Sequence, residues 1–394
     1  MRRTRHPTTG TSDLTHENSR SLSNADPAAV AARRGLADFP EWLSSSEPLR
    51  LSFSKLSDIG KALQMPFGSL VRSSVPEQHE DELVQYRTIK NHGVEPSRDL
   101  RDVIRLMRNR QDWAKDELSA RGLDENQLVG SVASDISAEE LGKAIREKLQ
   151  LDDAWYARKT VEEQFRYIRQ RASENGLIVM VDSKVGTSHR RLSVQEFRAF
   201  VLLDPTAPLI FINRNDSYSA MLFSLLHEIG HVLLGSNEIF NDDFAMGETR
   251  VERLINRAVV QSVVDNQDFC SYWKESSRRS NDILMIANEC ARRYGLSALA
   301  LTIHARYLGL AADEDVQTVS EEMRERLSKT RSSDAKGGNQ NNTNAFHLDS
   351  GFVGLVKSSI DRGSLSYSDG FSLLGVKSIQ AYDGLLQVKG MANE

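Results

Sequence analysis

Apolar positions three or four residues apart run along most of the chain, and one central stretch has a different period. Residues 97–122 and 137–172 carry the helical spacing, which indicates amphipathic helices. From residue 176 onward, three short β-branched runs predict strands, and their sequences are GLIVMVDSKV, FRAFVLLD and PLIFIN. Helical spacing then returns. This order predicts an α+β fold that is mostly helical and contains one short sheet.

The run directly after the third strand predicts a helix that is buried on more than one side. Residues 215–217 offer side-chain oxygens for an N-cap, and Gly235 is well placed to end the helix. Gly230, in the middle of the helix, leaves room for a neighbouring backbone. The apolar positions of the helix are Leu222, Leu225, Leu226, Ile229, Val232 and Leu233.

Three polar side chains interrupt this apolar run and form the motif His-Glu-x-x-His. His227 and His231 are four positions apart, so they share one face of the helix and can bind one metal ion. Glu228 lies about 100° around the helix from His227, within reach of a water molecule at an open metal position. Two neutral imidazoles and an open position are typical of catalytic zinc. The alternative is an ordinary buried helix with hydrogen-bonded core histidines.

A third ligand has to come from another element, and the segment beginning at Gly247 predicts the next helix. Its apolar positions follow helical spacing, so one face packs inward and can direct a carboxylate toward the first helix. Glu252 is the carboxylate that we choose, with Asn256 one turn later as its hydrogen-bond partner. Glu248 is the alternative ligand, although acids are common in the first turn of a helix without any metal.

The stretch from the third strand to the second helix resembles the ImmA/IrrE family of metallopeptidases. The resemblance rests on two sequences, APLIFINRNDSYSAMLFSLLHEIGHVLLGSNEIF and VERLINRAVV. In that family an apolar strand ending in Ile-Asn precedes an HExxH helix, and a Glu-x-x-x-Asn segment follows it. Residues 257–260 read Arg-Ala-Val-Val, where the family usually continues with Phe-Ala-Ala and a closing proline.

The resemblance implies a zincin-like peptidase domain, in which a short sheet lies beside the HExxH helix and an edge strand binds an extended substrate. It implies that His227, His231 and Glu252 bind zinc, a gluzincin-like ligand set, and that Glu228 is the general base. It also implies a protein substrate, typically a helix-turn-helix repressor, whose cleavage switches on genes of a mobile element or a stress response.

The N-terminal quarter of the chain carries two further expectations. Residues 1–24 are polar and poor in apolar side chains, which predicts a disordered tail. Residues 25–95 read as short helices, and part of them looks like the back half of a helix-turn-helix domain of the kind found ahead of such peptidases. Since no basic stripe marks a recognition helix, we favour a structural or protein-docking module over DNA binding.

The remaining segments are arranged around a peptidase domain that we place at residues 175–327. Residues 96–174 are expected to form a helical linker domain and residues 328–345 a flexible linker. Residues 346–394 are expected to form a C-terminal helical segment that either packs on the peptidase or gates its cleft. His304 lies in a predicted helix of the peptidase domain, either as a packed core histidine or as a contact to the oxyanion of the reaction.

Composition narrows the class of protein. A length of 394 residues predicts two or three domains, and a net charge of -5 gives no global case for nucleic-acid binding. Cys270 and Cys290 are expected to be free thiols, because neither belongs to a paired motif. No signal peptide and no apolar run of membrane-spanning length is present in the sequence, so we expect a cytoplasmic protein.

Two functions from different classes follow. The first is a cytoplasmic zinc-dependent endopeptidase. The second is a non-catalytic regulatory or antitoxin-like binding protein that keeps the zinc fold and docks a partner, or DNA, through its N-terminal helices. Glu228 favours the first, because a scaffold has no need of a general base.

Overall fold

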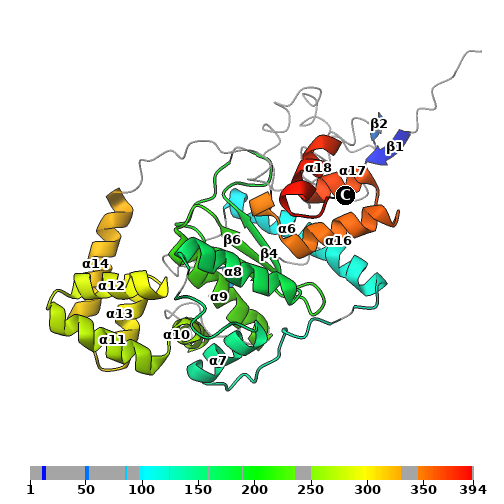
Figure 1. The fold of residues 1–394 in the computed structure, drawn as a ribbon. Helices are drawn as coiled ribbons and strands as arrows, with labels where there is room; N and C mark the ends of the chain where they lie inside the picture. The colour runs from blue at the N-terminus through cyan, green and yellow to red at the C-terminus, as the bar shows by residue number, and fades with distance from the viewer. Residues whose placement is uncertain are drawn as a thin grey trace, which may run out of the picture. The chain divides into compact units, whose positions relative to one another are not determined.

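The chain forms two compact units, Met1–Leu83 and Val84–Glu394. The larger unit contains every helix that the structure, a computed structural model, describes (Figure 1). Apart from residues 49–52 and 85–86, the predicted helical region of residues 25–95 lies outside the described residues, as does most of the predicted tail. The described residues are 11–14, 49–52, 85–86, 97–123, 125–157, 159–188, 190–235, 250–329 and 345–392.

The described part of the smaller unit is a pair of short strands. β1 (Thr11–Leu14) pairs antiparallel with β2 (Leu49–Ser52). These two strands lie within residues 1–24, where the sequence predicted a disordered tail, and within residues 25–95, where it predicted short helices. In β2, leucines alternate with polar residues at a period of two, which suits a strand and not a helix.

The larger unit is built around a small mixed sheet. Its strands lie in the order β3-β5-β6-β4, where β3 is Gln85–Tyr86, β4 is Ile178–Asp182, β5 is Ala199–Leu202 and β6 is Leu209–Asn213. β4 runs parallel to β6, whereas β5 is antiparallel to both β6 and β3. The three strands predicted from sequence are confirmed. Their continuous apolar runs are explained by burial of both faces of the sheet.

Each face of the sheet belongs to a separate hydrophobic cluster. Val179 and Val181 of β4 pack with α8 (Val161–Glu174) and α9 (Tyr218–Leu234). Ile178 and Met180 point the other way and pack with α6 (Arg98–Ala120) and the C-terminal helices. This alternation follows from the two-residue period of a strand. The result confirms a mostly helical α+β fold.

The C-terminal segment covers the second face of the sheet. It forms α16 (Ser350–Asp361), α17 (Tyr367–Leu374) and α18 (Ile379–Val388), which lie beside α6 in Figure 1. Phe352 and Leu385 join the same cluster as Phe211 of β6. The sequence left open whether this segment packs on the peptidase domain or gates its cleft. In the structure it packs on the domain. The predicted C-terminal helical segment is thus confirmed as three helices.

The remaining helices pack beside α9 or beyond it. α7 (Ala138–Lys148) and α10 (Arg250–Val263) contact each other and α9. Residues of α7 and α8 lie in one core with those of α9 and α10, so the predicted linker segment 96–174 shares its core with the peptidase helices. Four further helices form a group next to α10 (Figure 1): α11 (Asn266–Arg279), α12 (Ile283–Tyr294), α13 (Ala298–Tyr307) and α14 (Asp313–Lys329).

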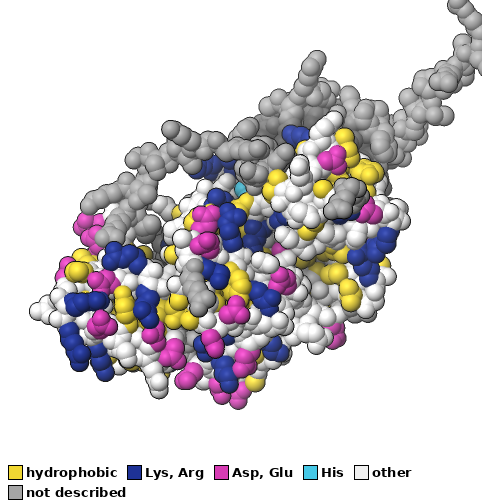
Figure 2. Space-filling model, viewed as in Figure 1, with side chains coloured by type: hydrophobic (Ala, Val, Ile, Leu, Met, Phe, Trp, Pro, Cys, Tyr) yellow, Lys and Arg dark blue, Asp and Glu magenta, His cyan; other side chains and the backbone are white. Residues whose placement is uncertain are grey.

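Charged side chains on the face drawn in Figure 2 are mixed in sign. Lysines and arginines alternate there with aspartates and glutamates and form no extended basic patch. Among the described residues, no helix is both long and apolar enough to cross a membrane.

Two glycines let α10 approach its neighbours closely. A Cβ atom at Gly142 of α7 would lie 2.9 Å from the carbonyl oxygen of Ala258, and one at Gly230 of α9 would lie 2.8 Å from Cγ2 of Ile255. The space at Gly230 thus admits a side chain and not the neighbouring backbone that the sequence suggested. Because α10 carries Glu252, the contact at Gly230 fixes the distance of that residue from α9, and the contact at Gly142 fixes the distance of α10 from α7.

Gly142→Ala should destabilise the protein, whereas Gly354→Ala should stabilise it. Both glycines lie inside helices, where alanine is favoured by about 1 kcal/mol. At Gly354 the new methyl group meets only Cε of Met391, at 3.9 Å. At Gly142 it meets backbone, and we expect a net loss of roughly 1–3 kcal/mol from overpacking. Urea unfolding of the two variants measures the difference, and equal stabilisation of both would contradict the close packing of α7 on α10.

Candidate metal centre

Both ends of α9 are fixed by hydrogen bonds. The Ser217 hydroxyl accepts from the backbone N–H of Ala220, and Gly235 ends the helix with a left-handed φ of 57°. The N–H groups of Gly130 and Val132 donate to the carbonyl oxygens of residues 232 and 233, at 3.0 and 3.1 Å. These bonds satisfy carbonyls that the last turn of a helix leaves unpaired. The predicted caps are confirmed.

The turn from β6 into α9 is held by two asparagines. The Asn213 side chain, fully buried, donates to the carbonyl of Phe197 at 3.1 Å and accepts from the N–H of Asn215 at 3.1 Å. Asn215 in turn donates to the carbonyls of Ser183 and Leu192. The Ile-Asn end of the strand therefore sets where α9 begins relative to the sheet.

The structure brings His227, His231 and Glu252 together at one point. The two histidine Nε2 atoms lie 3.1 Å apart. The carboxylate oxygens of Glu252 lie 3.1 Å from Nε2 of His227 and 3.2 Å from Nε2 of His231. Both histidines are buried, whereas the Glu252 side chain is 27% exposed. Residue 248, the alternative third ligand, lies outside the described residues.

These distances fit a tetrahedral ion. Ligands about 2.05 Å from a zinc ion at tetrahedral angles lie about 3.3 Å from one another, close to the three separations observed. The donor set of two imidazoles and one carboxylate is also that of catalytic zinc sites. Within the described part of the chain, this is the group of histidine, cysteine and acidic side chains that could hold a metal ion.

Asn256 orients the ring of His227. Its Oδ1 lies 3.0 Å from Nδ1 of His227. Because an amide oxygen only accepts, Nδ1 carries the hydrogen and the lone pair of Nε2 faces His231 and Glu252. The sequence predicted that Asn256 would bond to the Glu252 carboxylate, and the contact found is to the histidine. One turn of α10 thus supplies both the Glu252 carboxylate and the Asn256 side chain that orients His227 of α9.

The Glu252 carboxylate is ionised at neutral pH. Burial by itself raises its pKa, but attraction to His227 and hydrogen bonds with both histidines outweigh burial and hold the pKa well below its usual range. A deprotonated carboxylate is the form that binds a metal.

Glu228 is enclosed on α9 beside the first histidine. It is 1% exposed, and every residue of the helix from Met221 to Leu234 is buried. The ring of Phe223, one turn earlier, stacks on His227 with centroids 6.5 Å apart. The backbone that carries the HExxH side chains therefore has little freedom to move.

His304 packs into the helical group that follows α10. It is 3% exposed, its Nε2 lies 2.9 Å from Oδ1 of Asn266, and its ring packs on Phe269. Burial lowers its pKa to about 4, with a smaller contribution from Arg257. These contacts are those of a core histidine, the first of the two roles considered from sequence.

The three longer strands, in the order β5-β6-β4, have a partner on each outer side. Arg169 of α8 donates from Nε and Nη2 to the carbonyl of Val179 in β4, at 3.1 and 2.8 Å. At the opposite side, β5 pairs with Gln85–Tyr86. An extended substrate would have to displace one of these contacts in order to pair with β4 or β5.

The fold and the centre define a zincin-like domain with a candidate metal site on its central helix. Residues 182–305 match the family model described as the IrrE N-terminal-like domain, Peptidase_M78. The resemblance to the ImmA/IrrE family is thereby confirmed over this segment, which is a domain of the metallopeptidase type. Neither a curated protein nor a solved structure matches the chain.

Proposed function

We propose that the protein is a zinc-dependent endopeptidase that cleaves another protein. The match of residues 182–305 to Peptidase_M78 supports peptidase chemistry. The observation that carries the proposal is the convergence of His227 and His231 of α9 with Glu252 of α10, whose nitrogen and oxygen atoms lie within 3.2 Å of one another. Glu228 lies on α9 beside the first histidine.

Each residue of the site has a separate role in the proposed peptide hydrolysis. Zinc, when bound, would polarise the scissile carbonyl and lower the pKa of water. His227 and His231 hold the ion through Nε2, and Asn256 keeps the first ring in the required tautomer. Glu228 takes a proton from water on a carboxylate oxygen and later delivers it to the nitrogen of the leaving amine.

The substrate that we propose is a helix-turn-helix repressor, cut in the cytoplasm to change transcription. The family resemblance supports this class of substrate, and the free thiols Cys270 and Cys290 suit a reducing compartment. Recognition of the substrate, or of DNA, is assigned to the N-terminal region.

Purified protein with zinc should cut the repressor encoded by a neighbouring gene into two fragments. Mass spectrometry locates the cut, a chelator should stop it, and about one equivalent of added zinc should restore it. If the zinc-loaded protein binds the repressor and leaves it intact, the non-catalytic binding protein becomes the better description.

A further inference from the structure

One edge of the sheet, on the side of the helix that carries the metal ligands, is occupied by a segment of the protein's own chain. α9, which holds His227 and His231, contacts β5 and β6, whereas α8 covers β4. The outer edge of β5, and not that of β4, therefore borders the half of the sheet that α9 covers. β3 pairs with this edge in antiparallel register, with Gln85 opposite Val201.

β3 is the shortest strand of this sheet. It contributes two residues, against four or five in each of the other three strands. It is also the first described element of the larger compact unit, which begins at Val84. An exposed strand edge binds an extended peptide through backbone hydrogen bonds. β3 therefore occupies the position on β5 that an extended peptide would take.

The side chains of the proposed peptidase site are closed to a peptide in this arrangement. Glu228 and His227 are each 1% exposed, and His231 is 5% exposed. Of the three proposed metal ligands, Glu252 alone is partly exposed, at 27%. A general base acts on a group within about 3 Å of it, and an enclosed Glu228 does not permit this approach by a substrate. The arrangement is therefore a resting state, and part of the structure has to move before a substrate enters.

We propose that β3 is an autoinhibitory strand, which holds the place of a substrate strand on β5 and has to be displaced before a protein substrate binds. This role rests on the proposed peptidase function. Displacement replaces the backbone hydrogen bonds of β3 by equivalent bonds of the substrate, so the edge of β5 stays paired. Because a tethered strand competes at an effective concentration in the millimolar range, a substrate needs further contacts with the protein in order to displace it.

A double proline variant, Gln85→Pro with Tyr86→Pro, tests the backbone pairing. Neighbouring residues of a strand direct their N–H groups to opposite sides, so the double change removes the paired N–H whichever residue carries it. Proline lacks this donor, fixes φ at about −65° and is excluded from paired positions of a strand. The matched control, Gln85→Ala with Tyr86→Ala, keeps both N–H groups and should keep the pairing.

Hydrogen exchange of residues 199–202 measures whether β3 has left β5. The outer amide of β5 should exchange at least about tenfold faster in the full-length proline variant than in the alanine control. The zinc-loaded proline variant should also cleave the repressor encoded by a neighbouring gene at least about tenfold faster than the wild type. The reason is that an open state populated at about 10% or less limits the wild-type activity in proportion.

A synthetic peptide of residues 81–90, DELVQYRTIK, should bind the vacated edge of β5. In calorimetric titration it should bind the proline variant at least about tenfold more tightly than the wild type, because the tethered β3 competes for the edge in the wild type. The control probe is the same peptide with the two proline substitutions, which should bind neither protein.

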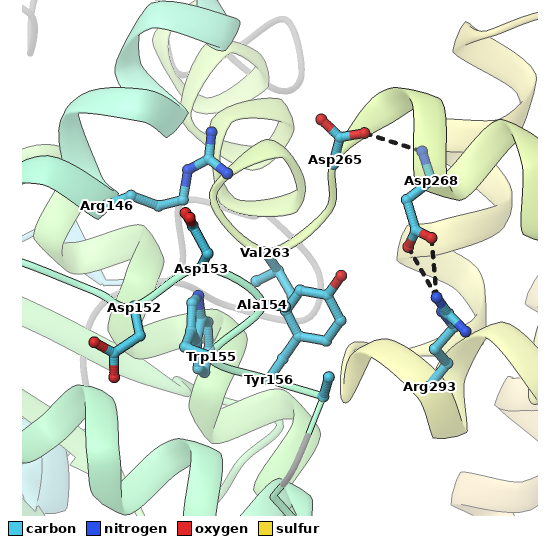
Figure 3. A pocket seen from close by; sticks show the side chains of 11 residues that line it. Arg146, Asp152, Asp153, Ala154, Trp155, Tyr156, Val263, Asp265, Asp268 and Arg293 are labelled. Carbon is cyan, nitrogen blue, oxygen red and sulfur yellow. Dashed lines mark hydrogen bonds and ion pairs between the residues drawn. The ribbon is translucent and has the colours of Figure 1, made fainter.

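A cavity of about 390 Å³ at the other end of α10 has to be excluded as the binding place of the peptide (Figure 3). Val263 lines it, eleven residues after Glu252, which is about 16 Å along the helix axis. Four aspartates line this cavity, and Asp153 is exposed there. Asp153→Asn changes the charge of the cavity without altering the sheet, and it should leave the peptide affinity of the proline variant unchanged.

Two results would overturn the proposal. They are unchanged exchange of residues 199–202 in the proline variant, and equal affinity of the peptide for that variant and for the wild type. If the double variant fails to fold, the two single proline variants decide, because only the proline whose N–H position faces β5 should release the strand.

Failure of the inhibition is distinguishable from failure of the peptidase function, since exchange and titration require no cleavage. Faster exchange without any cleavage would contradict the peptidase function and leave the displacement of β3 intact. Cleavage that is equally fast in the wild type and in the proline variant would contradict the inhibition alone.

Discussion

Glu228→Gln should abolish peptide cleavage and leave the bound metal in place. An amide has almost the same shape as a carboxylate but cannot take a proton from water, so we expect a loss of at least about 10²- to 10⁴-fold. The three side chains that converge on the metal position are unchanged, and the zinc content should stay near one ion per chain. Turnover of one substrate and elemental analysis of the same preparation measure the two quantities.

The matched control for this variant is Glu139→Gln, at an exposed acid in the first turn of α7, which should keep full activity. If the Glu228→Gln variant still cleaves the substrate, Glu228 is not the general base. Intact biological activity in a variant that no longer cuts would instead favour the regulatory binding protein.

Substitution of a metal ligand should greatly lower the metal content of the protein. His227→Ala and Glu252→Ala are each expected to bring the metal content well below one ion per chain, because two protein ligands do not complete a stable zinc site. Asn256→Ala should be milder. It leaves all three ligands but frees the ring of His227, and loss of such a support typically weakens metal affinity by about 10- to 100-fold.

Zinc titration against a competing chelator ranks these variants. The expected order of affinity is wild type, then Asn256→Ala, then the two ligand variants. Undiminished zinc in His227→Ala would contradict the site itself. If Glu252→Ala is the one ligand variant that keeps its full zinc content, the third ligand is Glu248 or another residue.

Features with a local chemical cause were predictable from the sequence. The caps of α9 at Ser217 and Gly235 follow from which side chains accept hydrogen bonds and which residue tolerates a positive φ. The three strands followed from their apolar runs. The i, i+4 spacing of the two histidines also determines their common face, whatever surrounds the helix.

Features that depend on tertiary packing were not predictable. No spacing rule says whether Asn256 meets Glu252 or His227, since that depends on how α10 rotates against α9. The α11 helix has a weak apolar pattern in the sequence, because only Phe269 and Trp273 mark its buried face strongly.

The place of α16 and α18 in the chain has a consequence for protein synthesis. The family match ends at residue 305, yet the apolar face of the sheet around Phe211 is covered by residues 345–391. At about 5–20 residues per second, a ribosome needs roughly 8–30 s to extend the chain from the end of the HExxH helix through this last segment. During that interval the nascent sheet exposes an apolar surface. We therefore expect chaperones to bind mainly to chains that already contain the HExxH helix but still lack their C-terminal helices.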